Sequence, residues 1–268
     1  MNKEVLFELY SKMYYLREFE KLISKSFLLE NIQKLPTSYY KLEALAVSLI
    51  SVSSPSDYLF STDRVHPYFI LKHNKIERGI KEYFKILKNS ENIANNTLRA
   101  FSFNDHPERV FNTMQGMALS FKETSFMPAF LITLDSMHAT LKQFLDSVIF
   151  SITNTLPAVY IIERTKQDDI TVLNNILETN RDKVLRAEIK TDDIFELRSV
   201  FLKAIRSAKE YLTPAVILCN AFNSSDPIEF LENKMVLLEL SLDELKETLN
   251  TEINYLINED LKEFLNVA

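Results

Sequence analysis

Glycine is scarce in this chain of 268 residues, which contains two, Gly79 and Gly116. Average usage would give roughly 19 in a chain of this length. Loops that bind phosphate need several glycines close together, because the bare backbone must approach the anion. The sequence therefore contains no Walker loop, no Rossmann fingerprint and no G-x-S-x-G nucleophile elbow.

Cysteine and long apolar runs are scarce as well. A single cysteine, Cys219, excludes an intrachain disulfide and a cysteine-rich zinc site, and we interpret it as a buried strand residue. No run of about 18 apolar residues is present, so we expect no membrane-spanning segment. The net charge of -6 argues against nucleic acid as a partner. We therefore expect a cytoplasmic protein without a membrane or nucleic-acid partner.

The residues that are present indicate an α/β fold. The hydrophobic content of 46% and the charged content of 25% are ordinary for a folded protein. Apolar runs typical of strands fall at residues 58–60, 98–103, 127–134, 158–163, 184–189 and 215–221. Helical periodicity is found at residues 4–29, 38–52, 107–123, 138–153, 169–181 and 192–211. Buried runs that alternate with amphipathic helices predict a mostly parallel sheet with helices on both faces.

No linker divides the chain, so we expect one domain over residues 1–268. Residues 1–56 form a helical N-terminal extension in this interpretation, residues 57–222 the α/β core and residues 223–268 a helical tail. The pattern after Asp226 is helical to the end of the chain. Ser241 and Glu244 have the spacing of a capping box, which predicts the start of a helix.

Several segments, in order along nearly the whole chain, resemble one family. The string LYSKMYYLREFE at residues 9–20 resembles the first helix of the alpha subunit of pyruvate-dehydrogenase-type 2-oxo acid dehydrogenases. Residues 57–66 resemble the family's strand that leads to a Tyr-Arg-x-His motif, and residues 156–163 resemble its Leu-Pro-Val-Ile-Phe-Val-x-Glu strand. Similar matches to a Gly-Gln-Glu-Ala segment and to the C-terminal helical tail are found at Glu43-Ala44, at 225–228 and at 242–245. The resemblance implies a thiamine-diphosphate-binding-type fold and an α2β2 heterotetramer with a beta-like subunit.

The family's cofactor residues are altered here. In the family, Mg²⁺ holds the diphosphate through the Asp of a Gly-Asp-Gly motif and through a later Asn, in keeping with the oxygen ligands that Mg²⁺ prefers. This chain has Leu134-Asp135-Ser136 in place of Gly-Asp-Gly and Thr165 in place of the Asn. Gln167 replaces a tyrosine of the same segment. The resemblance thus leaves Asp135, Ser136, Thr165 and Gln167 as cofactor-binding candidates, with Asp135 and Thr165 as a vestigial metal site.

The family's Tyr-Arg-x-His motif is kept in part. Arg64 and His66 remain, but Asp63 replaces the tyrosine, and the family's Gly-His-Ser loop has no counterpart. Arg64 is therefore a candidate cofactor-binding residue, and His66 and His138 are the candidate catalytic residues. Each also has a structural interpretation. Arg64 can pair with Asp63 or Asp57, His66 can be a structural histidine, His138 can be a first-turn helix residue, and Asp135 can cap the next helix.

The altered motif predicts an alpha-like subunit that has lost thiamine diphosphate–Mg²⁺ binding and acts as a structural partner of a beta-like subunit. Without the metal, Asp135 would be a costly unpaired carboxylate, so we expect Arg164, or else Lys166 or His138, to pair with it. One alternative is an active thiamine-diphosphate-dependent 2-oxo acid decarboxylase or dehydrogenase subunit with an atypical diphosphate site. Another is a subunit repurposed in specialised biosynthesis.

Overall fold

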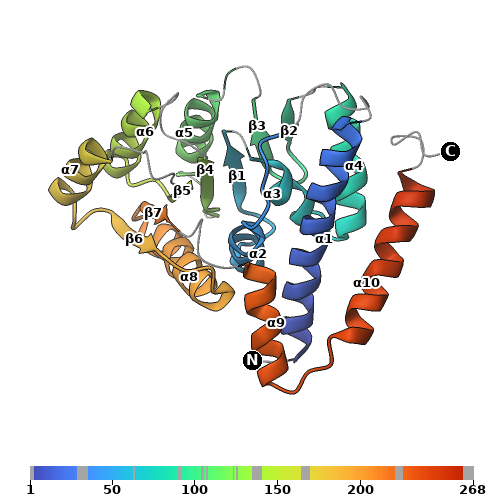
Figure 1. Cartoon of the computed structure of the whole chain (residues 1–268). Helices are drawn as coiled ribbons and strands as arrows, with labels where there is room; N and C mark the ends of the chain where they lie inside the picture. Colours follow the sequence, from blue (N-terminus) through green and yellow to red (C-terminus); the bar gives the residue numbers. More distant parts are fainter. Residues whose placement is uncertain are drawn as a thin grey trace.

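The computed structural model describes residues 3–28, 36–62, 64–89, 92–103, 106, 108–122, 124, 126–134, 141–163, 170–220 and 226–261. Within these residues the chain forms one seven-stranded sheet with helices on both of its faces (Figure 1). The α/β class expected from the alternating apolar runs and helical segments is therefore confirmed. No helix in the described part is long and apolar enough to cross a membrane.

The strands are arranged in the order β2-β3-β1-β4-β5-β7-β6. All neighbours pair in parallel except β2, which pairs antiparallel with β3. In β4, β5 and β7 every residue is buried, as expected for parallel strands that are covered on both faces. The strand bounds are β1 (Tyr58–Ser61), β2 (Ile93–Asn95), β3 (Ala100–Ser102), β4 (Phe130–Leu134), β5 (Ala158–Glu163), β6 (Leu185–Ile189) and β7 (Ala215–Cys219).

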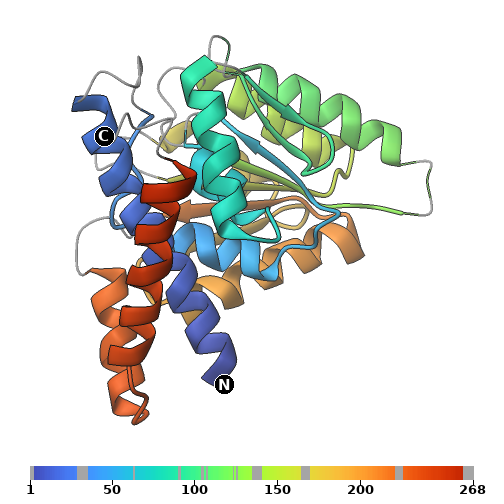
Figure 2. The ribbon, with the colours of Figure 1, turned by 90° about the vertical axis from the view of Figure 1, so that its right-hand side faces the viewer.

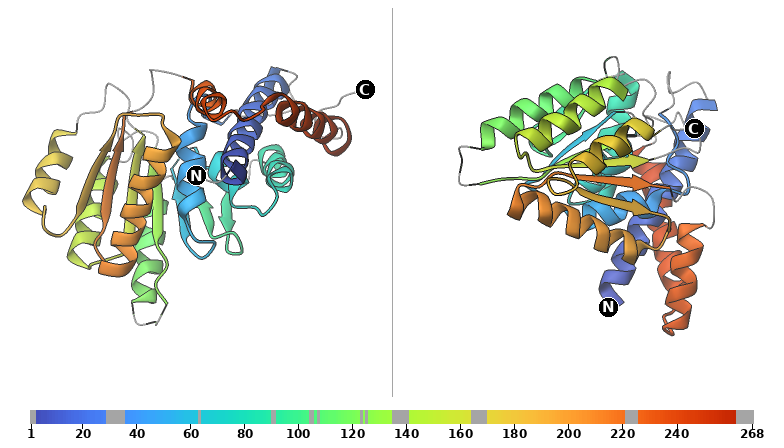
Figure 3. Two further views of the ribbon diagram at one scale, coloured as in Figure 1. Left: turned by 90° about the horizontal axis from the view of Figure 1, so that it is seen from below. Right: turned by 90° about the vertical axis from the view of Figure 1, so that its left-hand side faces the viewer.

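Two separate apolar clusters cover the two faces of the sheet. One contains the side chains of α5 (Arg109–Phe121), α6 (Leu141–Thr153) and α7 (Thr171–Thr179). The other contains those of α2 (Glu43–Val52), α3 (His66–Leu71), α4 (Ile76–Asn89) and α8 (Ile194–Tyr211). Figure 3 shows the sheet between these two layers. Alternate residues of each strand face opposite layers, so Ile161 belongs to the α2–α8 layer while Tyr160 and Ile162 belong to the α5–α7 layer.

The remaining helices form an outer layer on the α2–α8 side. The long helix α1 (Lys3–Leu28) contacts α2, α9 (Pro227–Leu237) and α10 (Asp243–Tyr255), and a short π-helical turn, Leu256–Asp260, follows α10. Figure 2 shows α1, α9 and α10 side by side, away from the strands. The two ends of the sequence thus meet over one face of the sheet.

The structure corrects the sequence interpretation in several places. The helix expected from residue 38 begins at Glu43, because Lys41 has φ 67, a left-handed conformation that no right-handed helix continues through. The helices α3 and α4 and the short strand β2 were not expected. The helix expected to start near Ser241 is confirmed, since α10 begins at Asp243, but its N-cap is Leu242 without a side-chain hydrogen bond, so the capping box at Ser241 is wrong.

Candidate functional site

The order of the strands points to the carboxyl ends of β1 and β4. The chain leaves β1 through α3 and α4 on one face of the sheet, and it enters β4 from α5 on the other face. In open α/β sheets, a crevice that binds ligands lies at the carboxyl ends of strands where the connections diverge in this way. The described residues at this end include Thr62 after β1, Thr133 in β4 and Glu163 at the end of the neighbouring β5.

Glu163 is the centre of a buried polar cluster at this end of the sheet. It is the last residue of β5 and only 1% exposed. The Tyr68 hydroxyl donates to Glu163 Oε1 at 2.7 Å, and the Tyr39 hydroxyl lies 3.2 Å from the same oxygen. Arg64 Nη1 donates to Glu163 Oε2 at 3.0 Å. Both carboxylate oxygens therefore have partners, and we call Arg64, Tyr39, Tyr68 and Glu163 the Glu163 cluster.

The hydroxyl and thiol groups around Glu163 are held in their protonated forms. Burial, and then the charge of Glu163, raises the pKa of both Tyr39 and Tyr68 well above the ordinary value. Burial and the same carboxylate also raise the pKa of the Cys219 thiol. Because a thiolate is the nucleophilic form of cysteine, Cys219 is a structural residue. The prediction that this cysteine is buried in a strand is confirmed, with 0% exposure.

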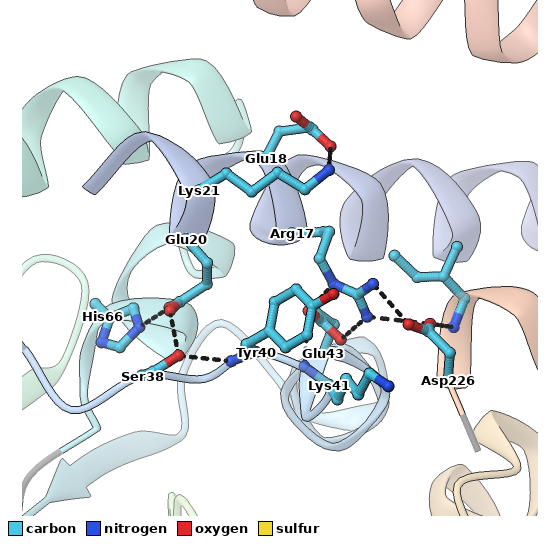
Figure 4. A network of polar contacts seen from close by, with 11 residues as sticks. Arg17, Glu18, Glu20, Lys21, Ser38, Tyr40, Lys41, Glu43, His66 and Asp226 are labelled. Atoms are coloured by element: carbon cyan, nitrogen blue, oxygen red, sulfur yellow. Dashed lines mark hydrogen bonds and ion pairs between the residues drawn. The ribbon is translucent and has the colours of Figure 1, made fainter. Parts of the chain in front are cut away.

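His66 is fully buried and bound to a carboxylate from α1. Its Nε2 lies 2.5 Å from Glu20 Oε1, and the Ser38 hydroxyl donates to the other oxygen of Glu20 (Figure 4). Burial alone would raise the pKa of Glu20, but the hydrogen bond and the charge of His66 hold it below the ordinary value. Glu20 therefore stays ionised beside His66, and this histidine serves to join α3 to α1.

A third buried group joins α1, α2 and the tail. Arg17 donates to both oxygens of Glu43, at 2.5 and 2.9 Å, and to both oxygens of Asp226, at 2.8 and 3.1 Å (Figure 4). Asp226 also caps α9, because its side chain accepts a hydrogen bond from the Ile228 amide. The planar fork of arginine suits two carboxylates at once. Arg17 therefore fixes the start of α9 against the first two helices.

The site residues expected from the sequence fall into two groups. Of those that are described, Arg64 pairs with Glu163 and His66 with Glu20. Pairing of Arg64 with Asp57 is wrong, because Asp57 lies at the other end of β1 and accepts a hydrogen bond from Lys209 Nζ at 2.9 Å. The remaining candidates lie outside the described residues; they are Asp63, Asp135, Ser136, His138, Arg164, Thr165, Lys166 and Gln167. Their roles stay predictions, and so does the pairing of Asp135 with a nearby cation. In the described part of the chain, no three His, Cys, Asp or Glu side chains gather as metal ligands would.

Sequence reasoning missed the carboxylates that bind Arg64 and His66. One signal was available for Glu163, because it directly ends a fully apolar parallel strand, where a charge has to find partners. No comparable signal marks Glu20, which lies in a helix with many charged residues. No family model matches this chain, and a search of curated proteins finds no match.

Proposed function

We propose that this chain is an alpha-like subunit of the pyruvate-dehydrogenase type that has lost thiamine diphosphate–Mg²⁺ binding and serves as a structural partner of a beta-like chain. The order of the matching segments and the α/β fold with its mostly parallel sheet support the family. The proposal for the fold is likewise the thiamine-diphosphate-binding type, which has helices on both faces of such a sheet.

One observation supports the proposed loss of cofactor binding. Arg64 and His66, the two residues kept from the family's Tyr-Arg-x-His motif, are each bound to a carboxylate of this same chain. Arg64 Nη1 donates to Glu163, so a diphosphate bound beside this guanidinium would lie close to a buried carboxylate of like charge. His66 has 0% exposure, so it offers no proton to a substrate. These two pairings support the proposed loss of diphosphate binding.

The helical tail supports a protein partner. Three consecutive apolar residues at the end of α9 are exposed, Val236 by 61%, Leu237 by 82% and Leu238 by 59%. Tyr255 near the end of α10 is 64% exposed. Contiguous exposed apolar side chains are typical of surfaces that another protein covers. The proposed beta-like chain would cover this surface of the tail.

The proposal is tested by co-expressing the chain with a beta-like chain and measuring the native mass of the purified product. We expect a heterotetramer that binds no thiamine diphosphate–Mg²⁺ through this subunit. The double variant Leu237→Ser/Leu238→Ser should lose the complex. Leu202→Ser, which changes an exposed leucine on α8, is the matched control and should keep it.

Two results would contradict the proposal. A chain that stays monomeric at high concentration and ignores the beta-like chain would exclude the structural role. Calorimetric titration with a micromolar constant for thiamine diphosphate–Mg²⁺, about -8 kcal/mol, would exclude the loss of the cofactor and favour an active enzyme.

A further inference from the structure

A cavity of about 1220 Å³ lies at the amino end of the sheet. It is bounded by the end of α2, the turn between α3 and α4, one side of α4 and the hairpin of β2 and β3. The Glu163 cluster lies at the opposite end of the strands. The volume is ample for a small molecule, since ligand pockets commonly measure about 300–1,000 Å³. This cavity is separate from the site of the proposed function.

Positive charge gathers along one side of this cavity. Lys72, Lys75 and Arg78 line it together with His73. The side chains of Lys75 and Arg78 make no hydrogen bond or ion pair with another described residue. Among the described lining residues the sole carboxylate is Glu82, and this group pairs with Lys85 at 3.1 Å. In a chain of net charge -6, a cavity with this lining is a local site of positive potential.

The helix α4 adds to the same potential. Its N-terminus carries a partial positive charge, which favours acidic side chains in the first turn. Here Lys75 directly precedes α4 and Arg78 lies in its first turn, so two cations lie at the unfavourable end of the dipole. Glu77 compensates in part, since it is also in that turn. Departures from such local electrostatic rules are expected mainly at functional or strained sites.

Two further basic side chains line the cavity, His73 and Lys72, and Lys72 Nζ donates to the Asp57 carbonyl oxygen at 2.9 Å. Burial lowers the pKa of Lys72 to about 8, with the nearby Arg99 adding to this effect and Asp57 opposing it. Burial, and then the charge of Arg78, lowers the pKa of His73, and Glu82 opposes this only in part. His73 Nε2 is buried and has no hydrogen-bond partner among the described residues. An anion in the cavity would favour the charged forms of both side chains.

The other side of the cavity is apolar. Ile50 of α2, Ile86 of α4, Ile93 of β2 and Leu98 before β3 line it. Inorganic anions gain nothing from such side chains, whereas an organic group buried against them gains roughly 25 cal/mol for each Å² of apolar surface removed from water. The lining is therefore complementary to a molecule with an anionic group at one end and an apolar group at the other.

We propose that this cavity binds a small organic phosphate monoester, with its phosphate at Lys75, Arg78 and the start of α4 and its organic group against the isoleucine and leucine side chains. Phosphate is favoured over a single carboxylate because Lys72, Lys75 and Arg78 line the same cavity and Arg78 lies in the first turn of α4. The proposal does not depend on the proposed function. Loss or retention of thiamine diphosphate binding at the other end of the sheet leaves it unchanged.

Calorimetric titration with phenyl phosphate tests the proposal on the full chain. We expect saturable binding, weaker binding of inorganic phosphate and no binding of phenol. In Lys75→Gln/Arg78→Gln the affinity for phenyl phosphate should fall by about tenfold or more, because two charges near the anion are removed. Glu82→Gln should bind more tightly than the wild type, since it removes the carboxylate beside the cations.

The double variant Arg181→Gln/Lys183→Gln is the matched control. It changes the net charge by the same amount, and both residues are exposed in the turn before β6, at the edge of the sheet farthest from β2. Its affinity should equal that of the wild type. Lys75→Arg/Arg78→Lys keeps both charges and should retain binding, which separates loss of charge from damage to the fold.

Three outcomes would overturn the proposal. The first is no binding of phenyl phosphate at millimolar concentration. The second is an equal loss of affinity in the control and in Lys75→Gln/Arg78→Gln, which would show a general charge effect. The third is equal affinity for phenyl phosphate and inorganic phosphate, which would exclude a role for the apolar side of the cavity.

Discussion

The two ends of the sheet differ in whether their positively charged side chains have carboxylate partners. At the carboxyl end, Arg64 and His66 are bound by the buried carboxylates of Glu163 and Glu20. At the amino end, Lys75 and Arg78 line an open cavity without such partners among the described residues. Charges that are neutralised inside the fold hold its elements together, whereas charges left facing a cavity are available to a ligand. The difference teaches that Arg64 and His66 are tied into the fold by carboxylates of this chain, while the cations at the other end line the cavity that we propose as a binding site.

The largest expected effect comes from breaking the Glu163 cluster. Glu163→Ala should lower the free energy of unfolding by about 3–5 kcal/mol, because it removes the carboxylate that neutralises Arg64 and leaves two tyrosine hydroxyls without their acceptor. Urea denaturation followed by circular dichroism measures this. Tyr160→Phe is the control on the other face of β5. It removes a hydroxyl that contacts Ser147 and Ser151 and should cost about 1 kcal/mol. Equal losses in the two variants would contradict the special role of the buried charge.

Arg17→Met should have an effect of similar or slightly smaller size. It leaves Glu43 and Asp226 side by side without their shared cation, at a cost of about 3–5 kcal/mol. Burial raises the pKa of Glu43 against the opposing effect of Arg17, so this carboxyl should take up a proton in the variant. Hydrogen exchange should show lost protection in α9. Arg17→Lys keeps the positive charge but not the planar guanidinium fork. Its stability should lie between those of the wild type and Arg17→Met. Unchanged protection in α9 would show that the tail is held by apolar contacts alone.

The pairing of Glu20 with His66 predicts a loss of stability in acid. The pKa of Glu20 is lowered in the folded chain, so the unfolded chain binds more protons between that lowered value and about 4.3. This contribution is present above the unfolded pKa and is lost as the pH falls through the folded pKa. Hydrogen bonds to charged groups contribute about 1.5–3 kcal/mol. In Glu20→Gln the stability measured by urea denaturation should depend less on pH below 4.3. Glu18→Gln, on the same helix, is the control and should match the wild type.

Lys72 predicts the opposite dependence at the amino end of the sheet. Because its pKa is lowered to about 8, the unfolded chain binds more protons between about 8 and 10.4, and stability rises with pH across this interval. The cost of the buried ammonium is fully present below pH 8. Lys72→Met should therefore differ most from the wild type at pH 7 and least near pH 10, as measured by urea denaturation. Lys75→Met is the control, because Lys75 is exposed. A constant difference across this range would contradict the assignment.

The smallest expected effect is on the stability of the double variant that removes the proposed phosphate-binding cations. Lys75→Gln/Arg78→Gln should raise the free energy of unfolding by about 0.3–1 kcal/mol, because it removes cations from the positive end of the α4 dipole. Thermal denaturation without added phosphate measures this gain, which should shrink at high salt as screening increases. A loss of stability would show that these cations serve the fold itself, and the contrast between the two ends of the sheet would no longer hold.

The sequence predicted the layered fold well and the site only in part. The strands at 158–163 and 215–219 fall where apolar runs of strand length indicated them, because a parallel strand that is covered on both faces has to be apolar on both. The start of α2 was placed too early, because Tyr39 fits the helical pattern but is drawn instead into contact with Tyr68 and Glu163. The hydrophobic pattern does not encode such a polar contact between distant segments.

The sequence by itself determined that this chain forms a mostly parallel sheet between helices, that Cys219 is buried and that no glycine flanks Asp135. These features depend on local periodicity and on single residues. Only the tertiary structure decided which carboxylate neutralises which cation, and that Lys72, Lys75 and Arg78 line one cavity with the β2–β3 hairpin. The physical reason is that a buried charge requires a partner of opposite sign but does not specify which one. Strand order and helix packing select that partner, and they leave the cations at the opposite end of the sheet facing a cavity.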